Sequence, residues 1–87
     1  MPKIEVYSTA VCPYCVAAKN LLKARGLEWI EQRVDTDPEQ RQVMLTRSGG
    51  ARTVPQIFIN DQHVGGFQEL AAADRSGQLK QLLEHSA

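Results

Sequence analysis

The stretch Cys12-Pro13-Tyr14-Cys15 constrains this chain more than any other feature, because it holds both cysteines of the 87-residue sequence. Two cysteines at this spacing can close a disulfide within one helical turn if the first precedes a helix and the second lies in its first turn. Pro13 favours that arrangement, since proline is frequent at the first position of a helix. Cys12 is then the N-cap residue, where free backbone amides and the helix dipole stabilise a thiolate. The pattern indicates a redox site.

The two thiols are expected to differ in acidity and in role. Lowering a thiol pKa by about three units requires roughly 4 kcal/mol in favour of the anion, and the helix dipole supplies at most about 2 kcal/mol. We therefore expect the Cys12 sulfur also to accept hydrogen bonds from amides near Tyr14 and Cys15. Cys15 should be buried and less acidic, so Cys12 is the predicted attacking thiol and Cys15 the predicted resolving thiol.

The cysteine pair could also be a structural disulfide, half of a zinc site, or two unrelated thiols. Zinc normally takes four protein ligands, or three and a water molecule, whereas the chain adds only His63 and His85 to the two cysteines. A structural bridge that closes so small a loop would constrain the unfolded chain little. We favour redox chemistry and predict no metal site.

Composition excludes several classes of protein. The chain is long enough for one small domain, residues 1–87. Its zero net charge and 43% hydrophobic residues match neither a nucleic-acid-binding protein nor a disordered tail. The longest apolar runs are too short to span a membrane, and Met1-Pro2-Lys3 leads into a strand without the pattern of a signal peptide. Because no other cysteine is available to bridge, the pair suits a reducing cytosol, and we expect a cytoplasmic protein.

Hydrophobic periodicity and turn residues predict alternating strands and helices. Along the second predicted helix, Val43, Met44 and Arg47 fall on the inner edge. Trp29 is expected in the core or at its edge, and His63 at an exposed or edge position of the last strand. Strands are expected at residues 3–7, 27–34, 56–59 and 62–65, and helices at 14–25, 38–48, 67–75 and 78–83.

Two further segments could bind a ligand. Pro55 opens a strand, which in isolation only marks a sheet edge, but a cis peptide bond there would let Val54 present its amide and carbonyl to a ligand. Gly65-Gly66 leads into a helix that starts near Phe67. Such a helix N-terminus can bind a carboxylate, although the two glycines alone could be no more than a turn.

The order of these motifs resembles that of a dithiol glutaredoxin of the small bacterial type, in the thioredoxin superfamily. The resemblance runs from about Lys3 to Leu83 and rests on the Cys-Pro-Tyr-Cys, Thr-Val-Pro and Gly-Gly motifs together. It implies an α/β protein with the thioredoxin fold, a central mixed four-stranded sheet flanked by helices on both faces. It also implies an enzyme that uses glutathione as its reducing co-substrate to reduce protein disulfides and protein-glutathione mixed disulfides. We expect no tightly bound cofactor and a monomer.

The resemblance assigns roles residue by residue. Cys12 would become glutathionylated, and Cys15 would release reduced protein substrates by closing the intramolecular disulfide. Lys19 and Arg47 compete with Arg41 for the glycine carboxylate of glutathione. The residues expected to contact glutathione are Tyr14 beside the thioether, Thr53, Val54 and Pro55 along the cysteinyl backbone, Gly66, Phe67, Gln68 and Glu69 at the γ-glutamyl end, and Arg41.

Two departures from the family pattern leave other functions open. Thr9 stands where relatives usually carry a lysine, and Gln68 stands where they have an acidic residue; Arg33 and Arg52 could replace the lost cation. A thioredoxin-like carrier fed by a flavoprotein reductase is the first alternative. The second is a module in which two subunits hold a [2Fe-2S] centre, although related proteins of that kind generally lack the proline found here at position 13.

Overall fold

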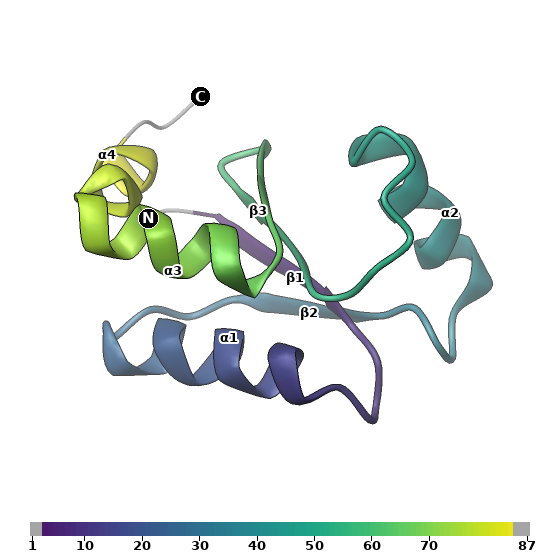
Figure 1. The fold of residues 1–87 in the computed structure, drawn as a ribbon. Helices are drawn as coiled ribbons and strands as arrows, with labels where there is room; N and C mark the ends of the chain where they lie inside the picture. The colour runs from purple at the N-terminus through teal and green to yellow at the C-terminus, as the bar shows by residue number, and fades with distance from the viewer. Residues whose placement is uncertain (1–2, 85–87) are drawn as a thin grey trace.

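The computed structural model describes residues 3–84, so His85, named above as a possible ligand, lies outside the described residues (Figure 1). All four strands and four helices expected from the sequence are present, in the expected order. They are β1 (Ile4–Ser8), α1 (Pro13–Ala24), β2 (Ile30–Arg33), α2 (Pro38–Arg47), β3 (Gln56–Ile59), β4 (Gln62–Gly65), α3 (Phe67–Ser76) and α4 (Gln78–Glu84).

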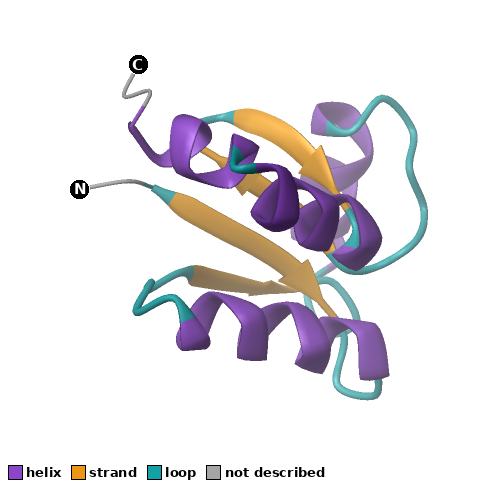
Figure 2. Cartoon of the chain, turned by 60° about the vertical axis from the view of Figure 1, so that its left-hand side comes forward, coloured by secondary structure: helices purple, strands orange, loops and turns teal. Residues whose placement is uncertain are grey.

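The four strands form one mixed sheet in the order β2-β1-β3-β4. β1 runs parallel to β2 and antiparallel to β3, and β3 and β4 form an antiparallel hairpin. The parallel pair is joined through α1, as a parallel connection requires a crossover. Figure 2 shows the strands in the middle of the molecule with helices around them. The predicted thioredoxin-type sheet is therefore confirmed.

The second strand is shorter than its predicted range of 27–34. Its ladder with β1 runs only from the Glu5–Ile30 pair to the Ser8–Arg33 pair. The preceding residues approach the sheet without joining it, and Trp29 packs against the core from a partly buried position. Trp29 thus lies at the core edge, as predicted.

Helices cover both faces of the sheet, and each face has its own apolar cluster. α1, α3 and α4 cover one face, and α2 covers the other. The cluster on the second face is small, with Tyr7, Val34, Met44 and Phe58 as its buried members. The cluster on the first face consists of Ile4, Val6, Ala18, Leu22, Ile57, Ile59, Leu70, Ala73 and Leu79. Because β1 is central and covered on both sides, all five of its residues are buried despite their polar-apolar alternation.

The β3–β4 turn ties distant parts of the chain together. Asn60 and Asp61 have φ angles of 50° and 68°, in the left-handed region that asparagine and aspartate tolerate better than most residues. The Asn60 side chain accepts a hydrogen bond from the Lys3 amide at 2.9 Å and donates one to the Leu82 carbonyl at 3.0 Å. The turn therefore links the start of β1 to α4.

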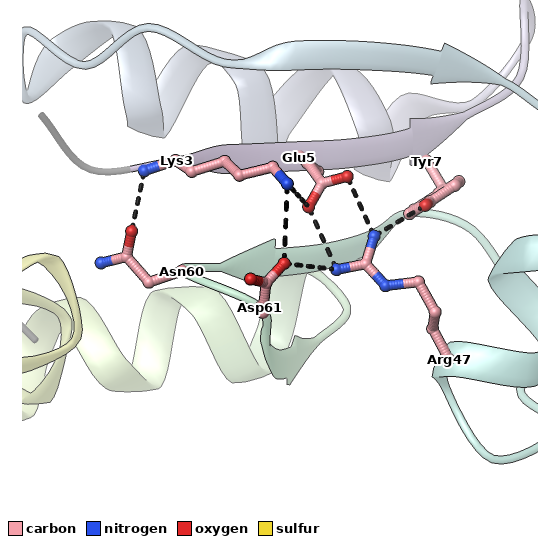
Figure 3. A network of polar contacts seen from close by, with 6 residues as sticks. All are labelled: Lys3, Glu5, Tyr7, Arg47, Asn60 and Asp61. Atoms are coloured by element: carbon pink, nitrogen blue, oxygen red, sulfur yellow. Dashed lines mark hydrogen bonds and ion pairs between the residues drawn. The ribbon is translucent and has the colours of Figure 1, made fainter. Parts of the chain in front are cut away.

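The α2 face is also held by charged side chains, shown in Figure 3. Arg47 donates to both carboxylate oxygens of Glu5 at 2.9 and 3.0 Å and to the Tyr7 hydroxyl at 2.9 Å. Its guanidinium also lies 4.1 Å from the centre of the Phe58 ring, within the range of a cation–π contact. The Glu5 side chain is only 10% exposed, so Arg47 neutralises a nearly buried charge.

The contacts of α2 correct one prediction about this helix. Met44 is fully buried and Arg47 reaches the sheet, as expected of the inner edge, but Val43 is exposed. Residues three apart on a helix share a face, whereas adjacent residues do not. Met44 therefore faces the core, and Val43 does not. Val43 lies on the side of Arg47, four positions later, but only the longer Arg47 side chain reaches the sheet.

We predict that Arg47→Met lowers the free energy of unfolding by about 3 kcal/mol, because the Glu5 carboxylate would lose its partner while remaining nearly buried. Urea denaturation at pH 7 measures the change. Asp61→Asn is the matched control: Asp61 also contacts Arg47, at 3.4 Å, but its side chain is 63% exposed, so its loss should cost less than about 1 kcal/mol. Equal effects of the two substitutions would contradict this role for Glu5 and Arg47.

Candidate active site

The two cysteines lie at the N-terminus of α1, as predicted, and are joined by a disulfide. Cys12 is the N-cap residue, with an extended backbone (φ −152°, ψ 99°), and Pro13 is the first residue of the helix. The Cys12 sulfur accepts a hydrogen bond from the Cys15 amide at 3.1 Å. Cys12 is half-buried, whereas Cys15 is only 1% exposed. This geometry gives the two sulfurs the different environments that the sequence predicted.

The hydrogen bond to the Cys12 sulfur favours a negative charge on that sulfur. An amide at the first turn of a helix has no acceptor within the helix and carries part of the positive end of the dipole. A thiolate at Cys12 would receive this amide as a charge-assisted hydrogen bond, which is stronger than a neutral one. Of the two expected amides, those near Tyr14 and Cys15, the structure shows the bond from Cys15.

The Thr-Val-Pro segment lies against the cysteine pair. The Val54–Pro55 peptide bond is cis, and the Val54 carbonyl oxygen lies 3.7 Å from the Cys12 sulfur. The two residues are 42 positions apart in the sequence. Val54 is half-buried, and Pro55 is buried just before β3. The fold therefore brings two separate motifs to one place.

A pocket of about 300 Å³ opens beside these motifs. The rings of Tyr14 and Phe67 lie nearly parallel, with their centres 6.3 Å apart. The walls of the pocket come from α1, the segment before β3 and the start of α3, through Tyr14, Thr53, Val54, Pro55, Gly66, Phe67 and Gln68. All seven are among the residues expected to contact glutathione, so the fold gathers three sequence motifs around one pocket.

Glu69 and Arg41 are the two predicted contact residues that do not line this pocket. The Glu69 carboxylate turns back to its own helix terminus and accepts a hydrogen bond from the Gly66 amide at 2.7 Å. A Cβ at Gly65 would lie 2.9 Å from the Glu69 side chain, and Gly65 has a φ of +122°. Both facts require glycine there. Arg41 is exposed on α2.

Most of the basic residues considered for the glutathione carboxylate are paired within the protein. Lys19 lies 3.2 Å from the Glu31 carboxylate, and Arg47 is held by Glu5. Arg33, considered as a replacement for the missing lysine, donates two hydrogen bonds of 2.8 Å to Asp35. Among residues 3–84, Arg41 and Arg52 take part in no ion pair.

Asp35 also supports this site, although no motif in the sequence indicated it. Its carboxylate accepts a hydrogen bond from the Ala10 amide at 3.0 Å, in the loop that leads to Cys12. The hydrogen bonds from Arg33, followed by the one from Ala10, hold the pKa of Asp35 well below its usual range. From the sequence, the segment around Asp35 predicted only the start of a helix. Asp37, not Asp35, caps that helix by accepting hydrogen bonds from the first amides of α2.

Comparison with known proteins identifies the family. The family model described as Glutaredoxin matches residues 4–64. The chain belongs to the glutaredoxin family. The glutaredoxin of Pseudomonas aeruginosa is 47% identical over 83 residues, covering 95% of this chain and 98% of the relative. Glutaredoxin 3 of Escherichia coli K12 is 44% identical over 84 residues, covering 97% of this chain and all of the relative.

Solved glutaredoxin structures share the fold. The solution structure of glutaredoxin from Brucella melitensis superposes with a TM-score of 0.80 at 43% identity, covering 94% of this chain and 88% of that one. A buckwheat glutaredoxin–glutathione complex has a TM-score of 0.82 at 29% identity, covering 92% of this chain and 74% of the buckwheat chain. Family membership and the paired cysteines make this glutaredoxin a glutathione-dependent thiol-disulfide oxidoreductase.

The described part of this glutaredoxin shows neither a membrane span nor a metal-binding cluster. Among residues 3–84, no helix is both long and apolar enough to cross a membrane. The same residues contain no group of three or more histidine, cysteine, aspartate or glutamate side chains able to hold a metal ion.

We predict that Asp35→Asn lowers stability at pH 7 and that the difference from the wild type shrinks on acidification. A carboxyl group whose pKa is lowered by folding stabilises the protein above its unfolded pKa of about 4, and this contribution is lost as the pH falls toward the folded pKa. Urea midpoints of both proteins between pH 7 and pH 3 measure the effect. A difference that stays constant with pH would show that the Asp35 charge contributes nothing to stability.

Proposed function

We propose that this protein, as a single domain and a monomer, reduces protein disulfides and protein-glutathione mixed disulfides in the cytoplasm with electrons from glutathione. Cys12 is the nucleophile and Cys15 the resolving thiol. The observation that carries the proposal is the position of the Cys12 sulfur. It accepts a hydrogen bond from the Cys15 amide at the start of α1 and lies beside a pocket walled by Tyr14 and Phe67.

Deglutathionylation requires only Cys12. Its thiolate attacks the glutathione sulfur of a protein-glutathione disulfide, and the protein leaves as a thiolate that takes up a proton. A second glutathione thiolate then attacks the glutathione sulfur bound to Cys12, which releases oxidised glutathione and regenerates the Cys12 thiolate. The rate depends on the thiolate fraction of Cys12, its nucleophilicity and access to the substrate sulfur. The half-buried position of Cys12 leaves it accessible.

Reduction of a protein disulfide also requires Cys15. The Cys12 thiolate attacks one substrate sulfur and forms a mixed disulfide with the protein. Cys15, whose Cα lies 5.2 Å from that of Cys12, then attacks the Cys12 sulfur and releases the reduced protein. The Cys12–Cys15 disulfide is returned to two thiols by two glutathione molecules, which leave as one molecule of oxidised glutathione.

The residues assigned to glutathione would each meet a different part of the tripeptide. Tyr14 would lie beside the thioether, and the backbone of Val54 would pair with the cysteinyl residue next to Cys12. The amides of Phe67 and Gln68, next to Gly66 at the N-terminus of α3, would receive the γ-glutamyl carboxylate, which a helix N-terminus favours. One oxygen of Glu69 is used by the Gly66 amide, and the second would accept the ammonium group.

The glycine carboxylate of glutathione is assigned to Arg41. Lys19, Arg33 and Arg47 each already neutralise a carboxylate of the protein. Arg41 is exposed and takes part in no ion pair among residues 3–84, so its charge is available to a ligand. Arg52 has the same property and is the competing candidate.

Replacing the two cysteines one at a time tests the assigned roles. Cys12→Ser should abolish reduction of both a glutathionylated peptide and a protein disulfide, because no nucleophile remains. Cys15→Ser should keep turnover of the glutathionylated peptide and lose reduction of the protein disulfide. Coupled assays with glutathione and glutathione reductase measure both activities. Activity that survives in Cys12→Ser would refute the proposed nucleophile.

Arg41→Gln should raise the KM for a glutathionylated peptide about two- to fivefold and leave kcat unchanged, since an exposed ion pair contributes about 0.2–1 kcal/mol. The increase should shrink as the salt concentration rises. Lys23→Gln, on the exposed side of α1, is the control and should leave KM unchanged. An effect of Arg52→Gln without one of Arg41→Gln would move the role to Arg52.

A further inference from the structure

A chain of side-chain hydrogen bonds runs from β4 to the edge of the pocket. His63 Nε2 lies 2.6 Å from Gln56 Oε1. The Gln56 side-chain nitrogen donates to the Thr53 carbonyl at 2.9 Å and also lies 3.3 Å from the Thr53 hydroxyl. Thr53 and Val54 line the pocket. The chain of hydrogen bonds thus joins a strand residue outside the pocket to the peptide that borders it.

The direction of these hydrogen bonds follows from chemistry. The Thr53 carbonyl can only accept, so the NH₂ group of Gln56 must face it. The carbonyl of the Gln56 amide then faces His63, and His63 Nε2 must carry a proton to donate. A reversed Gln56 amide would place two acceptors together at Thr53. The Thr53 carbonyl therefore fixes which way the Gln56 amide faces, and a hydrogen bond from His63 Nε2 supports the same orientation.

Both side chains are held in place by their surroundings. Gln56 is only 4% exposed, so its amide has no room to exchange its partners for water. The His63 ring is exposed on one side but stacks on Phe58, with 4.9 Å between the ring centres and 26° between the planes. Phe58 in turn contacts the Arg47 guanidinium. His63 is an exposed residue, as predicted, yet its ring has a defined orientation.

The Thr53 carbonyl, which Gln56 holds, also sets the direction of the Val54 N–H, the group proposed to bind glutathione. The Thr53 carbonyl and the Val54 N–H belong to one peptide unit, which is trans because only the next bond, Val54–Pro55, is cis in the described part of the chain. In a trans peptide these two groups point in opposite directions. Holding the Thr53 oxygen on Gln56 therefore turns the Val54 N–H away from Gln56. Within residues 3–84 this N–H donates to no other group.

We propose that Gln56 and His63 are positioning residues that aim the Val54 amide at glutathione by holding the Thr53 carbonyl. The proposal rests on the proposed function, in which the Val54 backbone pairs with the cysteinyl residue of glutathione. Neither side chain touches the reacting sulfurs. Their loss should weaken binding of the glutathione moiety while leaving the reactivity of Cys12 unchanged.

The test compares KM and kcat for a glutathionylated peptide in four variants of the full chain. Gln56→Met has a similar volume but no hydrogen bond, and its KM should rise about fivefold, as expected for one lost hydrogen bond. Gln56→Glu keeps an acceptor for His63 but cannot donate to Thr53, and its KM should rise at least as much. His63→Phe preserves the ring stack and should raise KM two- to threefold. Gln62→Met, at an exposed position of β4, is the control and should leave KM unchanged.

Two further measurements separate positioning from a general structural effect. The pH profile of Cys12 alkylation by iodoacetamide should be the same in all variants, since none changes the start of α1. The double variant Gln56→Met/His63→Phe should have the KM of Gln56→Met alone, because His63 acts through Gln56. Thermal unfolding checks that Gln56→Met, a substitution at a buried position, still folds. If Gln56→Met does not fold, the exposed His63→Phe tests the proposal by itself.

The results that would overturn the inference are distinct from those that would overturn the proposed function. A KM within twofold of the wild type in both Gln56→Met and His63→Phe, effects that multiply in the double variant, or a shifted alkylation profile would each exclude the positioning role. If the wild type itself fails to turn over the glutathionylated peptide, the proposed function fails instead.

Discussion

The contact between the Cys12 sulfur and the amide at the start of α1 is the interaction on which the chemistry depends. The thiolate is the nucleophilic form of cysteine, and stabilising the anion raises its fraction at neutral pH. The helix supplies that stabilisation through groups that its own hydrogen-bond pattern leaves unpaired. Because Cys12 lies directly before Pro13, the first residue of α1, the start of the helix determines how reactive the Cys12 sulfur is.

The remaining parts of the site come from distant parts of the sequence, and the sheet brings them together. β1 ends just before the redox loop, β3 begins just after the cis Pro55, and β4 ends at the glycines that open α3. These strands are neighbours in the order β2-β1-β3-β4. The antiparallel pairing of β1 with β3 places the end of one beside the start of the other, so the loops they carry meet at one edge of the sheet.

The sequence predicted what depends on local pattern and motif spacing. The order of strands and helices and the N-cap position of Cys12 follow from short segments whose chemistry can be read alone, whereas the seven residues around the pocket were implied by the resemblance to glutaredoxins. Polar contacts between segments far apart in sequence were not predicted. Arg47 and Glu5 are 42 residues apart, and Asp35 and Ala10 are 25 residues apart. Each involves common surface residue types, and many other pairings were equally compatible with the pattern. Even Gln56 and His63, seven residues apart, meet only because the hairpin register places them together.

The Asn60 side chain has a consequence for the architecture of the molecule. It bonds the backbone at Lys3 and at Leu82, so the first and last described parts of the chain approach the same turn. β1 then runs from this turn toward Cys12, which places both of these parts at the opposite end of the sheet from the reactive sulfur. A large folded substrate can therefore approach the catalytic end without meeting either of them.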